Sequence, residues 1–182
     1  MISVFVFFAA CSGGSDPSKD DTAAAGPDVP AVVINEFVAD NKTYADPDGD
    51  PVDTGDLGEF DDWIELYNAD DAAVPLDGFY LTDDLDQPTR WALPTGVTLE
   101  PGEFYLVWAD GQPEQGDGNH ADFSLEKNGE TLGLYFATDG GEAWANKVDF
   151  GEQATDRSSA RIPDGSMDWE AGVEPTPGAS NG

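Results

Sequence analysis

The stretch that most constrains the fold is residues 61–68, where apolar and acidic side chains alternate until an asparagine ends the run. Ile64 and Leu66 fall on one face of an extended segment, and Glu65 falls on the other between two aromatic side chains. This period of two residues is typical of a β-strand. We expect the first face to lie in the main core and the second face to be partly covered by other parts of the chain.

Short apolar runs recur along the chain, separated by Gly, Pro, Asn and Asp. Further strands are expected near residues 32–38, 76–82, 90–93, 104–108, 123–125, 131–136 and 147–150. Gly140-Gly141 is typical of a hairpin, and the run at 104–108 is apolar on both faces, which indicates a central strand. No window has a sustained helical period, so the sequence predicts an all-β sandwich or barrel without long helices. Its expected core side chains are Ile34, Trp63, Ile64, Leu66, Phe79, Leu81, Trp91, Leu106 and Trp108.

The first residues have the pattern of a processing signal. Residues 1–10 are apolar and too short to span a bilayer, which takes about twenty residues. Phe8-Ala9-Ala10-Cys11 resembles the bacterial lipobox, where a lipid is attached to the cysteine, and an ordinary secretory leader is the alternative. We predict a signal peptide at 1–10, a lipid on Cys11, a flexible spacer at 11–30 and one domain at 31–182. The predicted location, after secretion across the inner membrane, is the bacterial cell envelope or cell surface.

The chain is strongly acidic, with 38 Asp and Glu against 7 Lys and Arg and a formal net charge of −31. Nucleic-acid binding is disfavoured because it requires a cationic surface that displaces counterions. Repulsion on this scale destabilises a compact state unless salt or bound cations screen it. The composition therefore implies a saline setting or a divalent-cation partner. The alternative, which is the default for scattered surface acids, is acidity that only serves solubility.

A long acidic loop precedes the strand at 61–68. Calcium binds about six to eight oxygen atoms from flexible loops, and the candidate ligands are Asp46, Asp48, Asp50, Asp53, Asp56 and Glu59. The loop begins like an EF-hand, but Pro51 and Leu57 stand where that motif needs Gly and Glu, so we reject an EF-hand. The alternative is a solvated loop without a metal.

Several separated motifs occur in the order seen in the bacterial lamin-tail domain. They are Ile34-Asn35-Glu36-Phe37, Asp62-Trp63-Ile64-Glu65-Leu66-Tyr67-Asn68, Leu76-Asp77-Gly78-Phe79-Tyr80-Leu81, Asp156 to Ser158 with Arg161-Ile162-Pro163-Asp164-Gly165, and Thr176-Pro177-Gly178-Ala179-Ser180-Asn181. The chain resembles that family over roughly residues 31–181. The resemblance implies an immunoglobulin-like β-sandwich, found on secreted and surface bacterial proteins.

Two further interpretations accompany the resemblance. A histidine often stands at this place in the family pattern, so His120, the only histidine, is interpreted as a turn residue with a satisfied ring. Arg157 and Arg161 lie among acids near the C-terminal end, and we interpret Arg161 as half of a structural ion pair with Glu36 or Glu65. An anion site is the alternative for these arginines.

Catalysis is not expected from this composition. One histidine and one cysteine leave little for a Ser-His-Asp or Cys-His arrangement or for zinc, and chance carboxylate pairs are abundant. The leading hypothesis is a non-catalytic binding or structural module. Its expected partners are the membrane, through the lipid anchor, and a surface protein or polysaccharide. The alternative is a carbohydrate-binding or adhesion module that uses Trp144 or Trp169, and a carboxylate-based hydrolase is the weakest hypothesis.

Overall fold

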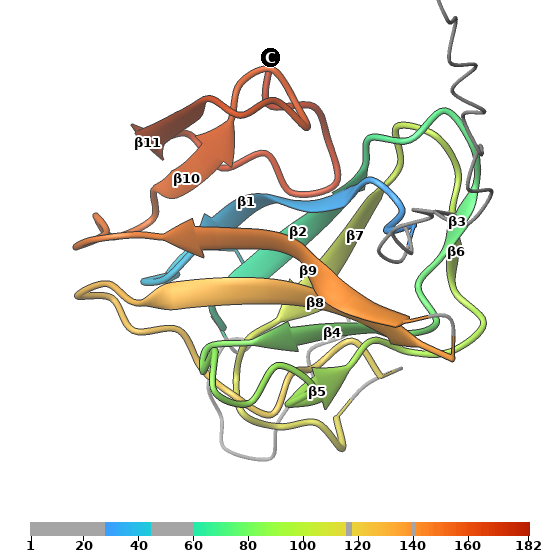
Figure 1. Cartoon of the computed structure of the whole chain (residues 1–182). Coiled ribbons are helices and arrows are strands. Elements are labelled where there is room, and N and C mark those ends of the chain that lie inside the picture. The colour runs from blue at the N-terminus through green and yellow to red at the C-terminus, as the bar shows by residue number, and fades with distance from the viewer. Residues whose placement is uncertain (1–27, 45–59, 116–117, 140) are drawn as a thin grey trace, which may run out of the picture.

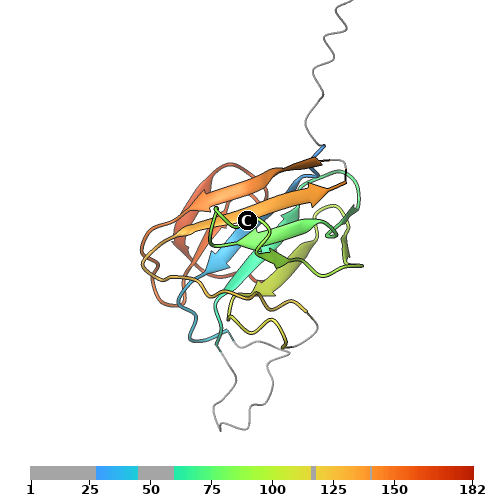
Figure 2. The ribbon, with the colours of Figure 1, turned by 60° about the horizontal axis from the view of Figure 1, so that its bottom comes forward.

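The computed structural model describes residues 28–44, 60–115, 118–139 and 141–182. These residues form two main antiparallel sheets (Figures 1 and 2). The larger sheet has the order β11-β10-β1-β2-β7, with bounds Trp169–Val173, Ser158–Arg161, Val32–Val38, Trp63–Asn68 and Phe104–Trp108. The second has the order β5-β4-β8-β9, with bounds Trp91–Ala92, Phe79–Thr82, Thr131–Thr138 and Gly141–Asp149. A small separate sheet pairs β3 (Val74–Pro75) with β6 (Thr98–Leu99). Within the described ranges no helix is long and apolar enough to cross a membrane.

The main core lies between the two sheets, which confirms the predicted all-β sandwich. Ile64 and Leu66 of β2 pack in one cluster with Phe79 and Leu81 of β4. Eight of the nine side chains expected in the core are buried, and Leu106 is half-buried. Burial of such apolar side chains is the main stabilising term of the fold.

A β-bulge at Asn35 decides which side chains of β1 enter this core. Ile34 pairs with Leu66, but Glu36 pairs with Glu65, so β1 contains one extra residue at this point. Strict alternation from Ile34 would place Glu36 in the core. Because of the bulge, Glu36 lies beside Glu65 on the outer face of the larger sheet, and the next side chain of β1 returns to the core.

The outer face of the larger sheet has an apolar cluster of its own. Trp63 and Trp108 are register partners and pack with Val38, while Tyr44 covers both indole rings at centroid distances of 6.3 and 6.0 Å. The second face of the strand at 61–68 is therefore buried as well. This explains why aromatic residues flank the glutamate in the sequence.

The strand pattern differs from the sequence expectation in several places: the short strands β3 and β6 were not expected, and β9 begins earlier than the strand expected near 147–150. The apolar run of β7 lies at the edge of its sheet instead of its centre. Beyond that edge, residues 119–121 bond to the backbone of Trp108 and cover the strand there. Residues 123–125 form only an isolated bridge, from Ser124 to Asp110. Strands β10 and β11 were not expected, since β10 consists of Ser, Ala and Arg and lacks an apolar signal.

Candidate functional site

The site begins with two glutamates that are register partners on β1 and β2. Glu36 and Glu65 are fully buried on the outer face of the sheet, although glutamate is almost never buried without a partner. Both belong to the motifs singled out in the sequence. Two neighbouring buried carboxyls need a cover that excludes water and donors that hydrogen-bond to their oxygens.

The cover is residues 174–182, called here the C-terminal segment, which follows β11 (Figure 1). The backbone N–H of Thr176 donates to both oxygens of Glu36, at 3.1 and 3.2 Å, and its hydroxyl donates to Oε2. The backbone N–H of Gly178 donates to Oε2 of Glu65 at 2.6 Å. The two glutamates thus hold the C-terminal segment through its backbone.

A third carboxylate, Asp164, ties the same segment to the loop between β10 and β11. Its oxygens accept hydrogen bonds from the Asn35 amide at 3.0 Å, from the Asn181 backbone N–H at 3.1 Å and from the Ser180 hydroxyl. The side-chain oxygen Oδ1 of Asn35 in turn accepts from the backbone N–H of Gly165 at 3.0 Å. Asn35, the bulge residue of the motif at 34–37, is therefore bonded directly to the motif at 161–165 and, through Asp164, to the motif at 176–181.

Arg161 has different partners from those that the sequence predicted. Its Nε donates to the Ile34 carbonyl oxygen at 2.7 Å and another guanidinium nitrogen donates to the carbonyl oxygen of Ser166, whereas we expected an ion pair with Glu36 or Glu65. The guanidinium also lies 4.7 Å from the centre of the Trp169 ring. Arg161 is thus a buried brace between β1 and the loop after β10.

The electrostatics follow from this burial. Burial raises the pKa of Glu65 from its ordinary value of 4.5 to about 7, against the lowering effect of the Gly178 N–H, and the neighbouring Glu36 raises it further. Burial also raises the pKa of Glu36, against the lowering effects of the Ser158 side chain and of Thr176. Both shifts have desolvation of the charged form as their main cause.

This arrangement has the properties of a structural cluster. Neither carboxyl is exposed, and each points at backbone N–H groups of the C-terminal segment, where a substrate would have to bind. No group of three or more His, Cys, Asp or Glu in the described part of the chain could hold a metal ion. Glu36 and Glu65 therefore hold the C-terminal segment against the larger sheet.

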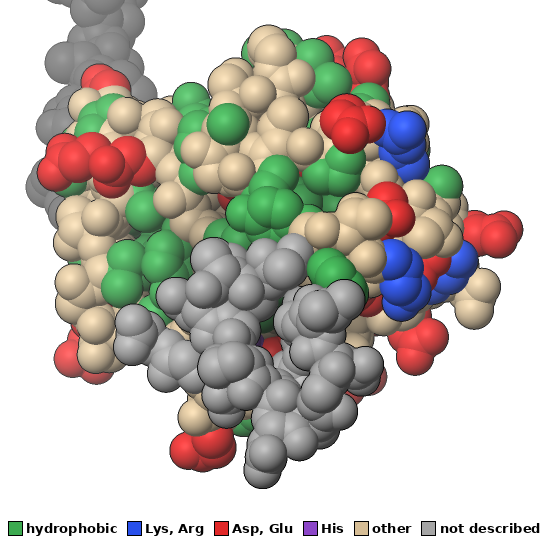
Figure 3. Space-filling model, turned by 180° about the vertical axis from the view of Figure 1, so that it is seen from behind, with side chains coloured by type: hydrophobic (Ala, Val, Ile, Leu, Met, Phe, Trp, Pro, Cys, Tyr) green, Lys and Arg blue, Asp and Glu red, His purple; other side chains and the backbone are tan. Residues whose placement is uncertain are grey.

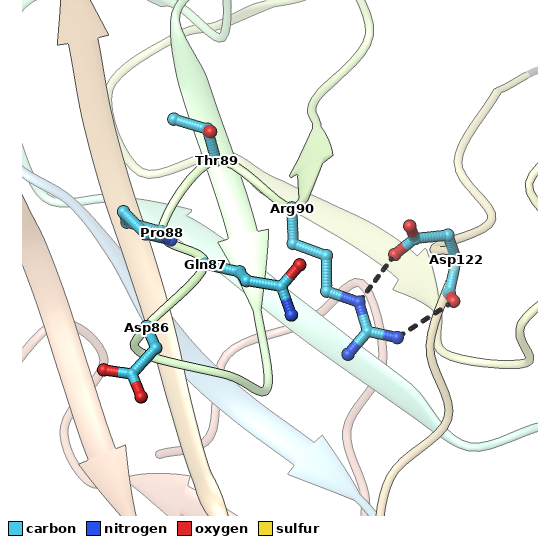
Figure 4. A pocket seen from close by; sticks show the side chains of 6 residues that line it. All are labelled: Asp86, Gln87, Pro88, Thr89, Arg90 and Asp122. Carbon is cyan, nitrogen blue, oxygen red and sulfur yellow. Dashed lines mark hydrogen bonds and ion pairs between the residues drawn. The ribbon is translucent and has the colours of Figure 1, made fainter.

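A depression of about 660 Å³ lies around Arg90 and the loop before it (Figure 4). Arg90 could attract an anion there, but its Nε donates to Oδ1 of Asp122 at 3.2 Å and a second nitrogen bonds to the Asp122 carbonyl oxygen. A third contact joins the guanidinium to Asp83. The guanidinium is thus already neutralised by acids of the protein itself.

Three other exposed cations have acidic partners too. Lys42 lies 3.3 Å from Asp40, Lys127 contacts the same carboxylate, and Arg157 pairs with Glu174. On the face shown in Figure 3 the Lys and Arg side chains gather at one side, with acidic side chains beside them. Exposed pairs of this kind contribute little stability, about 0–1 kcal/mol each.

His120 is fully buried, and its Nδ1 lies 2.6 Å from Oδ2 of the equally buried side chain of Asp110. The backbone on both sides of this histidine pairs with Trp108 at the edge of the larger sheet. The sequence identified the histidine but did not identify Asp110 as its partner. The pair fixes the segment that covers the edge of β7.

The two tryptophans considered for sugar stacking are half-buried. Trp144 has the Lys147 Nζ 4.1 Å from its ring centre and Tyr135 against its edge at 5.0 Å. Trp169 is covered on one face by Arg161 and borders a groove of about 280 Å³ that Phe37 and Phe150 also line. Of these two tryptophans, only Trp169 thus borders a described groove.

The candidate calcium ligands Asp46, Asp48, Asp50, Asp53, Asp56 and Glu59 lie outside the described residues. The described residues on either side of that stretch are joined by one side chain. The Asn41 amide donates to the carbonyl oxygens of Tyr44 at 2.6 Å and Asp61 at 2.8 Å. Burial raises the pKa of the adjacent Asp62 to about 6.

Comparison with known proteins gives one family. The lamin tail domain matches residues 25–151, which is well over half of the chain. The search of curated proteins found no match, and the search of solved structures found none either. The motifs after residue 151 lie outside the matched range, but β10, which contains Ser158 and Arg161 of those motifs, pairs with β1 in the larger sheet. The chain therefore belongs to the lamin tail domain family, with its immunoglobulin-like β-sandwich.

Proposed function

We propose that this protein is a lipid-anchored lamin-tail module of the bacterial cell envelope with a non-catalytic binding or structural role. The supporting observation is that Glu36 and Glu65, the motif carboxylates most suited to chemistry, are buried and bonded to the backbone of the C-terminal segment. A hydrolase would need such carboxyls open to substrate. Membership of the lamin tail domain family supports the same class of function.

The anchor is tested by replacing Cys11 with serine. The variant should move from the membrane fraction to the soluble fraction, because each buried methylene of a lipid contributes about 0.8 kcal/mol to membrane binding. Cell fractionation and metabolic labelling with a fatty acid provide the measurements. Ser12→Ala is the matched control and should stay lipidated and membrane-bound. Membrane association that survives Cys11→Ser would contradict the anchor.

We extend the proposal to a calcium ion held by the acidic stretch at 46–59. Its support is the charge of −31 and the Asn41 amide, which joins Tyr44 and Asp61 on either side of the stretch. Calcium should raise the melting temperature more than magnesium does, and more than sodium chloride at equal ionic strength. Replacing Asp48 and Asp50 with asparagine should remove the difference, while the same change at Asp20 and Asp21 in the spacer should not. Equal stabilisation by sodium chloride would mean screening alone.

The alternative, a carbohydrate-binding or adhesion module, would use the groove beside Trp169. Sugar binding needs an open aromatic face and free hydrogen-bond donors, yet Arg161 covers one face of Trp169. Of the polar groove residues, Gln153 and Ser159 bond to each other at 2.8 Å. Glycan-array binding that is lost on Trp169→Ala would favour the alternative over a protein partner.

A further inference from the structure

The carboxyl pair of Glu36 and Glu65 has one feature that the hydrogen bonds of the fold leave unexplained. Oε1 of Glu65 is buried and accepts no hydrogen bond of normal geometry from the described residues, although the Asn35 side chain lies close enough to lower the pKa, while Oε2 accepts the short bond from Gly178. A buried carboxylate oxygen without a donor is costly. Because the described residues form no metal site, the simplest group that satisfies it is a proton.

The charges around Glu65 make this proton favourable. Glu36 faces it from β1 and Asp164 approaches from the loop after β10, and both repel a second negative charge. From β7 the register partner is the uncharged Leu106, and residues 175–182 contain no charged side chain. The nearest guanidinium, that of Arg161, donates to backbone carbonyls instead. Two neighbouring carboxyls in one dry site do not both ionise readily.

We propose that the C-terminal segment is a proton-controlled clasp: it closes over β1 and β2 while the Glu36–Glu65 pair holds a proton, and it loosens when both carboxyls are ionised. Opening lets water reach the carboxylates, which relieves their repulsion and desolvation. The N–H groups of Thr176 and Gly178 are the first to lose their partners. The inference does not depend on the lipid anchor or on any binding partner.

The direction of the pH effect follows from proton linkage. The closed form holds a proton up to the raised pKa of Glu65, about 7, while an open and hydrated carboxyl returns to its ordinary value of 4.5. The closed form therefore binds more protons between these values. Raising the pH through this window shifts the equilibrium toward the open form.

Amide hydrogen exchange in the full chain tests the clasp. Protection of the Thr176 and Gly178 amides, corrected for intrinsic exchange, should fall about tenfold to 100-fold between pH 5 and pH 8. The Ile64 amide in β2 should remain protected at both pH values. The Glu65→Gln side chain has the same shape and keeps one acceptor oxygen, but it does not titrate. In this variant the protection of the Thr176 and Gly178 amides should therefore fall by only about threefold or less between pH 5 and pH 8.

The matched control is Glu130→Gln. Burial raises the pKa of Glu130 to about 7 as well, but Glu130 precedes β8 in the other sheet and bonds to the N–H of Glu126. This variant should leave the pH dependence of the Thr176 and Gly178 amides unchanged. The clasp is overturned if protection in the parent does not change with pH, or if Glu65→Gln shows the full loss. It is also overturned if the Thr176 and Gly178 amides are as well protected at pH 8 as the Ile64 amide, because they then open only together with the whole domain.

Discussion

Replacing Trp63 with alanine is expected to lower the free energy of unfolding by about 3–5 kcal/mol, since a buried aromatic side chain is lost and a cavity remains. Trp63 is fully buried and packs with Val38, Tyr44 and Trp108 on the outer face of the larger sheet. The effect is a large fraction of the total stability of a domain, which is about 5–15 kcal/mol. Urea unfolding followed by circular dichroism gives the measurement.

Met167 provides the control for this experiment. Its side chain is 88% exposed, so Met167→Ala should change the free energy of unfolding by no more than about 0.5 kcal/mol. Equal urea midpoints for the two variants would show that the outer face of the sheet is not a second core. The prediction concerns the fold and is independent of any ligand.

The protein is also expected to become more stable as the pH falls from 8 to 5. The pKa values of Glu65 and Glu130 are raised to about 7 and that of Asp62 to about 6, each mainly by burial. Between these values and their ordinary ones, the folded chain binds protons that the unfolded chain releases. The free energy of unfolding therefore rises as the pH falls through this window. Asp40, whose pKa is lowered to about 2, acts in the opposite direction but only under more acidic conditions.

Glu65→Gln separates the buried pair from the general charge effect. One unit of pKa corresponds to about 1.4 kcal/mol, so the change from 4.5 to about 7 corresponds to an upper limit of about 3 kcal/mol. The variant should melt at a higher temperature than the parent at pH 8 and show a flatter pH profile. Glu170→Gln, at an exposed position of β11, removes the same charge and is the control. If the melting temperature of Glu65→Gln depended on pH in the same way as that of the parent, Glu65 would not be the group with the raised pKa.

The sequence predicts the fold well where apolar side chains alternate. Strand β2 follows from this period, and β1 and β8 follow from short apolar runs bounded by polar or turn residues. The apolar pattern does not predict β10, because the buried side chains of this strand are mostly small or polar. Its burial comes from tertiary contacts with β1 and with the C-terminal segment, which a local pattern does not contain.

The candidate site is predictable only in part. The motif residues Glu36, Glu65 and Arg161 stand out, yet the carboxylates accept from backbone N–H groups and the guanidinium donates to carbonyls. The pairing of the two glutamates depends on the bulge at Asn35, which moves one side chain to the other face of the sheet. A polar Asn-Glu pair inside an apolar run is the one available signal of that bulge.

The measurement that tests this account most directly is the titration of the Glu65 carboxyl itself, followed by carbon-13 NMR of the full chain. The account places Glu65 in a closed site beneath the C-terminal segment, next to a second carboxyl. It therefore predicts a titration midpoint of about 7. A midpoint near the ordinary value of 4.5 would contradict the account, because it would mean that water reaches the carboxyl and that the C-terminal segment does not close the site.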